Sequence, residues 1–98
     1  MKRRIGFRPE VRRDLAEIWS YTAEQWDSEQ AERYTNRLRE RITAVAENPH
    51  LGSDCDDLYP ELRRIKCGSH LIYYLADEDT LDVVRILHQR RDTRSLIR

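Results

Sequence analysis

The sequence has few cysteines, no long apolar run and no excess of charge of either sign. Its two cysteines, Cys55 and Cys67, do not form a CxxC pair, and no apolar stretch follows the initial Met-Lys-Arg-Arg. We therefore expect a cytoplasmic protein with reduced thiols, without a signal peptide or a membrane span. His50 and His70 would complete a site of two cysteines and two histidines, but the spacing is not that of a zinc finger. We expect no metal and no cofactor.

The charges cancel, because the chain has 18 basic and 18 acidic side chains. A zero balance argues against a strong, sequence-independent grip on nucleic acid. The distribution is uneven, however: Arg and Lys dominate both termini and residues 63–66, whereas acids cluster in two loops and at the start of the last expected strand. A local basic patch is therefore compatible with the sequence.

With 98 residues, the chain is long enough for one domain, spanning 1–98, and too short for two. A short extended segment at 3–7 precedes Pro9, which fits the first turn of a helix. Apolar residues then recur at helical spacing up to Trp26, and a second apolar stripe runs through 31–46. Asp27 and Gln30 have the form of a capping box between the two, so the pattern predicts an antiparallel helical hairpin.

The second half of the chain predicts strands. Residues 48–60 are rich in turn-forming and acidic residues, which indicates a loop. Strands follow at 62–67, 70–76 and 81–88, separated by Gly68-Ser69 and by a turn at 77–80. The expected fold class is therefore α+β: an N-terminal strand, a helical hairpin, and a three-strand antiparallel meander in the same sheet, followed by a short polar tail.

The expected meander is apolar on both faces. Alternation, with Ala76 opposite Leu81, assigns its residues to two faces, and a slip of one residue in the last strand would exchange that strand's members. The first face carries Leu71, Tyr73, Leu75, Val84 and Ile86. The second face carries His70, Ile72, Tyr74, Ala76, Val83, Arg85 and Leu87.

A helical hairpin covers only one face of such a sheet. The tail offers only Leu96 and Ile97 as apolar cover for the other face. Because large exposed apolar patches typically mark partner-binding surfaces, we expect a partner over the second face. The expected contacts are Ile72, Tyr74, Val83, Arg85 and Leu87. The alternative is that the tail folds back over this face.

Five segments along the chain carry a family resemblance. They are residues 14–21, 30–34, 48–52, 68–74 and 83–92, and the last is the most specific. In this order and spacing they resemble the ParE toxins, which belong to the RelE/ParE superfamily of bacterial type II toxin–antitoxin modules. His70, His88 and Asp92 match the ParE signature. The resemblance covers almost the whole chain and implies the same fold.

The resemblance implies a toxin that acts by protein contact and not by its own chemistry. Such toxins trap DNA gyrase on cleaved DNA, and a cognate ParD-like antitoxin neutralises them in a hetero-oligomer. The antitoxin wraps an otherwise disordered C-terminal segment around the toxin, and apolar burial offsets the cost of ordering that segment. We expect that segment on the second face, and we expect no sequence-specific binding of nucleic acid.

Contacts to the target are expected at the hairpin turn and in the tail. Trp26 lies at the turn, and tryptophan is enriched at interfaces, although it also staples helices together. The tail contributes a cationic cluster of Arg90, Arg91 and Arg94, for which the alternative is a solvated terminus.

The RelE branch of the superfamily cleaves messenger RNA on the ribosome. That reaction needs cations around a pentavalent phosphate and a group that moves a proton. RelE-like enzymes have an arginine where this chain has His70, and a tail tyrosine where it has Leu96. We therefore expect no enzymatic activity, with a RelE-like ribonuclease or a non-toxic relative as the alternatives. The side chains that could supply these cations and proton-transfer groups are Arg63, Arg64, Lys66, His70, Arg85, His88 and Arg90.

Overall fold

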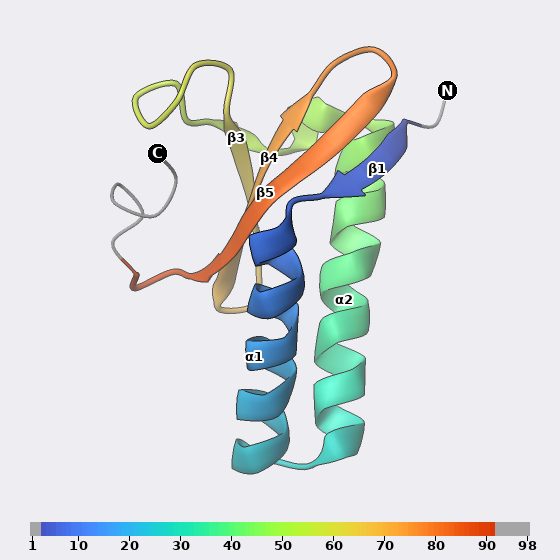
Figure 1. The fold of residues 1–98 in the computed structure, drawn as a ribbon, viewed down its shortest axis with the longest axis vertical. Helices are drawn as coiled ribbons and strands as arrows, with labels where there is room; N and C mark the ends of the chain where they lie inside the picture. Colours follow the sequence, from blue (N-terminus) through green and yellow to red (C-terminus); the bar gives the residue numbers. More distant parts are fainter. Residues whose placement is uncertain (1–2, 92–98) are drawn as a thin grey trace.

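The computed structural model describes residues 3–91, in which two long helices lie against one face of a five-stranded sheet (Figure 1). This arrangement confirms the predicted α+β fold class. In chain order the elements are β1 (Arg4–Phe7), α1 (Pro9–Gln25), α2 (Ser28–Glu47), the 3-10 helix η1 (Pro49–Leu51), β2 (Ser53–Asp54), β3 (Arg63–Cys67), β4 (His70–Ala76) and β5 (Thr80–His88).

The sheet has the strand order β1-β5-β4-β3-β2. The N-terminal strand β1 pairs in parallel with β5, while all other pairs are antiparallel. The three strands predicted for the meander are present. The segment predicted as a loop at 48–60 also contains η1 and the short strand β2, which pairs with β3 through Ser53 and Asp54. These two short elements are too brief to show a periodic pattern.

Proline opens α1, which has no side-chain cap, whereas side chains cap the starts of α2 and η1. Pro9 opens α1, and the carboxylate of Asp27 accepts a hydrogen bond from the backbone N–H of Gln30 at 2.7 Å, as the capping pattern predicts. The helix α2 ends before Asn48, whose side chain accepts from the backbone N–H of His50 and so begins η1. Together these caps fix the hairpin.

A β-bulge between β4 and β5 changes the predicted faces. Ala76 lies opposite Leu81 as expected, but the register shifts beside Tyr73 and leaves Val84 as the extra residue of β5. The alternation beyond it is reversed. Arg85 lies opposite Tyr73, Ile86 opposite Ile72 and Leu87 opposite Leu71, so the predicted faces of these three β5 residues are wrong.

The face expected to be open lies beneath the helices. Ile72, Tyr74 and Val83 are fully buried, and they pack with α1 and α2 residues such as Val11 and Leu38. The expectation that these three residues line an open surface is therefore wrong, because the hairpin covers this face and not the other.

The outer face is covered by a loop of the same chain. Tyr73, Val84 and Leu87 form a second buried cluster with Cys55 and Leu62 of the segment between β2 and β3. Both faces of the meander are apolar, as predicted, but no large open face remains in the described residues. The tail residues Leu96 and Ile97, expected as the alternative cover, lie outside the described residues.

Within residues 3–91, neither helix combines the length and apolar character needed to cross a membrane. Both cysteines of the described chain are buried free thiols, Cys55 on the outer face and Cys67 on the helix face. No group of three or more metal-binding side chains is found in this part of the chain.

The segment after α2 is fixed to the sheet by two side chains. The buried Tyr74 hydroxyl donates to the carbonyl of Pro49 at 2.6 Å. Arg63 donates to the same carbonyl at 3.0 Å and to the carbonyl of Gly52 at 2.6 Å. Burial raises the pKa of Tyr74, so its hydroxyl stays protonated as a donor. Position 52 must be glycine, because a Cβ there would overlap the Tyr74 hydroxyl and lie 2.6 Å from the Arg64 carbonyl oxygen.

We predict that Gly52→Ala destabilises the protein by about 2 kcal/mol, since the added methyl forces apart groups that are already packed. Urea denaturation followed by far-UV circular dichroism measures the change. Gly6→Ala in β1 is the matched control, because its Cβ would meet nothing closer than the Asp82 carboxylate at 3.9 Å. Equal midpoints for both variants would contradict this account of Gly52.

Candidate partner-binding groove

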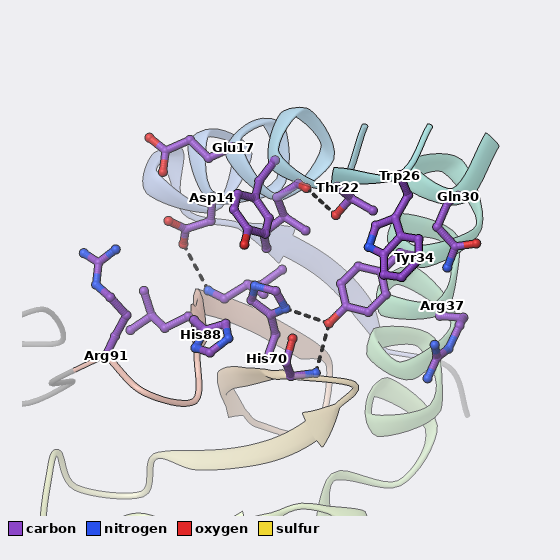
Figure 2. Close-up of a pocket in the computed structure, with 15 residues that line it drawn as sticks. Asp14, Glu17, Thr22, Trp26, Gln30, Tyr34, Arg37, His70, His88 and Arg91 are labelled. Carbon is purple, nitrogen blue, oxygen red and sulfur yellow. Dashed lines mark hydrogen bonds between the residues drawn. The ribbon is translucent and has the colours of Figure 1, made fainter. Parts of the chain in front are cut away.

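The helical hairpin extends beyond the sheet, so the distal halves of α1 and α2 lack strands beneath them (Figure 1). A groove with a volume of about 690 Å³ lies there, between the hairpin, the β3–β4 turn and the end of β5. Figure 2 shows side chains from α1 and α2 on one side of the groove, facing His70 and His88 of the sheet. We call this space the groove.

The apolar part of the groove is formed by α1. Trp26 is 75% exposed and Tyr21 is 65% exposed, the two highest values for large apolar side chains in residues 3–91. Ile18 is buried beside them, and all three line the groove. The exposure of Trp26 is incompatible with the alternative in which it is buried as a staple of the hairpin.

The polar part of the groove is a cluster of Tyr34, His70 and His88, which we call the polar wall. The Tyr34 hydroxyl lies 2.6 Å from Nδ1 of His70, accepts from the backbone N–H of Ser69 at 3.1 Å, and lies 3.2 Å from the carbonyl of Cys67. The His70 and His88 rings meet edge to face, with centroids 5.4 Å apart. Helix α2 is thereby tied to the β3–β4 turn.

The turn itself is shaped around that hydroxyl. Gly68 has a φ of +59°, and a Cβ at this position would lie 2.6 Å from the Tyr34 hydroxyl. Both the left-handed backbone and the close approach require glycine. The position of the polar wall therefore depends on a glycine in the two-residue turn.

His70 is neutral at ordinary pH. Burial, together with the adjacent His88, lowers the pKa of His70 to about 4. The carboxylate of Asp14 acts in the opposite direction but does not compensate. An imidazole in this state donates and accepts hydrogen bonds without carrying charge.

A buried ion pair forms the base of the groove. The carboxylate of Asp14 in α1 accepts two hydrogen bonds from Arg85, at 2.7 and 2.8 Å, and a third from the backbone N–H of Ile86 at 3.0 Å. Because β1 pairs with β5 only as far as Val83, the Ile86 N–H lies on an edge without a strand. The Asp14 carboxylate accepts the hydrogen bond that a neighbouring strand would otherwise accept from this N–H. The sequence reasoning missed Asp14, although a carboxylate within the apolar stripe of α1 is a signal that could have found it.

The predicted site residues divide into those at the groove and those elsewhere. His70, His88, Trp26, Leu87 and Arg91 line the groove. Arg90 is exposed next to Arg91, whereas Arg94 and Asp92 lie outside the described residues.

The cations required for ribonuclease chemistry are dispersed. Arg63 binds the Pro49 and Gly52 carbonyls, and Arg85 is paired with Asp14. Arg64 and Lys66 are exposed on β3, on the face opposite the helices. Among the described residues, the structure brings together the two histidines but not a clamp of arginines and lysines.

We predict that Asp14→Asn lowers the free energy of unfolding by about 3 kcal/mol, because it leaves the buried Arg85 charge without a counter-ion. Urea denaturation at neutral pH measures the loss. Glu17→Gln is the control, since this exposed residue of the same helix has no ion pair within residues 3–91. A similar small effect for both variants would show that the pair contributes little.

The low pKa of His70 predicts a loss of stability in acid. The unfolded chain binds a proton at His70 below about pH 6.5, whereas the folded protein does so only near pH 4, so stability falls as the pH decreases through this window. Urea midpoints at pH 7 and pH 4.5 measure the decline. His70→Gln should show a smaller decline in the urea midpoint than the unmodified protein. His50→Gln, at an exposed position, should show the same decline as the unmodified protein. Identical declines in all three proteins would contradict the assignment.

Comparison with other proteins identifies the family to which the chain belongs. The model of the family described as "ParE toxin of type II toxin-antitoxin system, parDE" matches residues 5–93. The chain is 41% identical over 93 residues to Toxin ParE1 of Mycobacterium tuberculosis, covering 94% of this chain and 95% of that protein. It is 36% identical over 85 residues to Toxin ParE of Escherichia coli, covering 85% of this chain and 82% of the relative.

A solved structure has the same fold. A chain of the structure titled "Chromosomal ParDE TA system from P. aeruginosa" superposes with a TM-score of 0.75 over 89% of this chain and 96% of that chain, at 12% identity. At this identity the likeness concerns the fold alone. The extensive sequence matches decide the family: the chain belongs to the ParE toxins of type II toxin–antitoxin systems.

Proposed function

We propose that this ParE-family protein arrests growth by binding DNA gyrase directly, and that a cognate ParD-like antitoxin neutralises it by occupying the groove. The proposal requires the protein to act in the cytoplasm, where gyrase works on DNA. Family membership supports a toxin of a toxin–antitoxin pair. The geometry of the groove supports direct protein contact as its means of action.

The observation that carries the proposal is the exposure of Trp26 and Tyr21 at a groove that Arg91 also lines. Large aromatic residues and arginine contribute most of the binding energy in protein interfaces. Neither aromatic side chain belongs to the buried core cluster, and exposed large apolar side chains typically mark binding surfaces. We assign Trp26, Arg90 and Arg91 to contacts with the target.

The antitoxin surface is assigned to the groove and not to the sheet. Ile72, Tyr74 and Val83 are inaccessible in the folded chain, so an antitoxin would reach them only by displacing the helices. Leu87 also lines the groove, and Arg85 lies beneath it in the pair with Asp14. An antitoxin segment in the groove would cover Trp26 and thereby prevent contact with the target.

The polar wall supports binding over catalysis. His70 carries no charge at neutral pH, and the candidate cations Arg63 and Arg85 are held by other groups. A phosphate in the groove would therefore meet fewer positive charges than cleavage of RNA requires. No specific observation favours the ribonuclease alternative.

We predict that the purified protein inhibits supercoiling by gyrase, and that Trp26→Ala raises the concentration for half inhibition about tenfold or more, as expected for an interface hot spot. A gel supercoiling assay measures the effect. Tyr59→Ala is the matched control, because it removes an exposed aromatic side chain from a loop outside the groove. Supercoiling should return to the uninhibited level when the antitoxin is added.

Two outcomes would overturn the proposal. Unaffected gyrase together with cleaved ribosome-bound messenger RNA would identify a RelE-like ribonuclease. Unaffected gyrase, intact messenger RNA and no growth arrest on induced expression would identify a non-toxic relative.

A further inference from the structure

The proton positions of the polar wall are set by its hydrogen bonds. Tyr34 accepts from the backbone N–H of Ser69 at 3.1 Å and donates to the Cys67 carbonyl at 3.2 Å, and its oxygen lies 2.6 Å from Nδ1 of His70. Nδ1 of His70 is therefore engaged inside the protein, and Nε2 is the ring nitrogen left for a ligand.

His88 also uses its Nδ1 inside the protein. This atom accepts from the backbone N–H of Arg90 at 3.2 Å, so Nε2 of His88 carries a proton. Both rings therefore keep Nε2 for a ligand. Nε2 of His88 is a donor, and protonation of His70 makes its Nε2 a second donor, so the complementary ligand group is a hydrogen-bond acceptor.

The charges around the two rings favour an anionic acceptor. From α1, Asp14 and Glu17 face the rings, but the charge of Asp14 is neutralised by Arg85. From α2, Tyr34 faces them, and Arg37, which also lines the groove, lies over the Tyr34 ring with its guanidinium carbon 5.7 Å from the ring centroid. Arg91 follows β5. Within residues 3–91 no ion pair engages Arg37 or Arg91, so these two cations outnumber the single carboxylate of Glu17.

The same groove also has an apolar side. Ile18, Tyr21 and Trp26 line it, and its volume of about 690 Å³ exceeds that of one carboxylate side chain many times. Space of this size accommodates several neighbouring side chains of a peptide segment. A segment that fits both sides has an acidic residue next to apolar ones.

We infer that the polar wall is a carboxylate-binding site, and that it takes an Asp or Glu side chain of the antitoxin segment whose apolar neighbours rest on Tyr21 and Trp26. This inference rests on the proposed function for the identity of the partner, but its chemistry belongs to the groove alone. The carboxylate accepts from the Nε2–H groups of His70 and His88 and is attracted by Arg91. A bound carboxylate stabilises the protonated form of His70, so binding becomes tighter as the pH falls toward the low pKa of this ring.

The groove chemistry is tested with three small probes that share a phenyl ring: 3-phenylpropionate, its neutral amide, and phenyl phosphate. NMR titration measures their dissociation constants and the pKa of each histidine. We expect the carboxylate to bind about tenfold tighter than the amide, as charge-assisted hydrogen bonds do, and to raise the pKa of His70. His88→Leu should remove the preference, whereas His50→Leu outside the groove should retain it. Tyr34→Phe removes the hydrogen bond that holds the His70 ring and should weaken the preference even if a histidine variant does not fold.

Equal binding of carboxylate and amide, or binding that leaves the histidine signals unchanged, would overturn the inference. Tighter binding of phenyl phosphate than of the carboxylate would also overturn it, and would point to a nucleic-acid phosphate as the ligand group.

The antitoxin itself separates this inference from the proposed function. Its affinity for the unmodified toxin is compared with that for His88→Leu at pH 6 and pH 8 by calorimetry. We expect a loss of about tenfold for the variant at both pH values. If the antitoxin binds the unmodified toxin and the variant equally, the carboxylate site is wrong and the proposed function stands. If the antitoxin does not bind the unmodified toxin at all, the proposed neutralisation is wrong, whatever the probes show.

Discussion

The carboxylate of Asp14 is the contact on which the arrangement of helices and sheet depends. β1 must end at Phe7 because the chain turns into α1, so the edge of β5 beyond Val83 has no neighbouring strand. An unpaired backbone N–H at a buried edge is costly. Asp14 satisfies it and neutralises Arg85 with the same two oxygens. The position of α1 along β5, and with it the base of the groove, follows from this one side chain.

Most elements could be predicted from local patterns, because their causes are local. The strand at His70–Ala76 has the predicted bounds, and the cap at Asp27 was visible in the spacing to Gln30. The faces beyond Val84 could not be predicted, since a bulge adds one residue without any change in composition: Val83 and Val84 are equally suited to either face. The two-residue alternation of a strand does not show where a bulge interrupts it.

The candidate site was only partly predictable, for a different physical reason. His70 and His88 were singled out by resemblance, and the structure brings them together. Tyr34 looked like one more residue of an apolar stripe, because its bond to the β3–β4 turn joins segments far apart in the sequence. The coverage of the outer face depended likewise on Cys55 and Leu58, which lie in the segment predicted only as a loop. Long-range contacts leave no periodic signal.

The bare Cα of Gly68 has a consequence for how this sequence can diverge. The Tyr34 hydroxyl fills the space that any side chain at position 68 would need, and Gly68 provides the backbone bend that brings that hydroxyl to the turn. Neither position can change alone without loss. Substitutions in α2 at Tyr34 and in the β3–β4 turn at Gly68 therefore constrain each other during evolution.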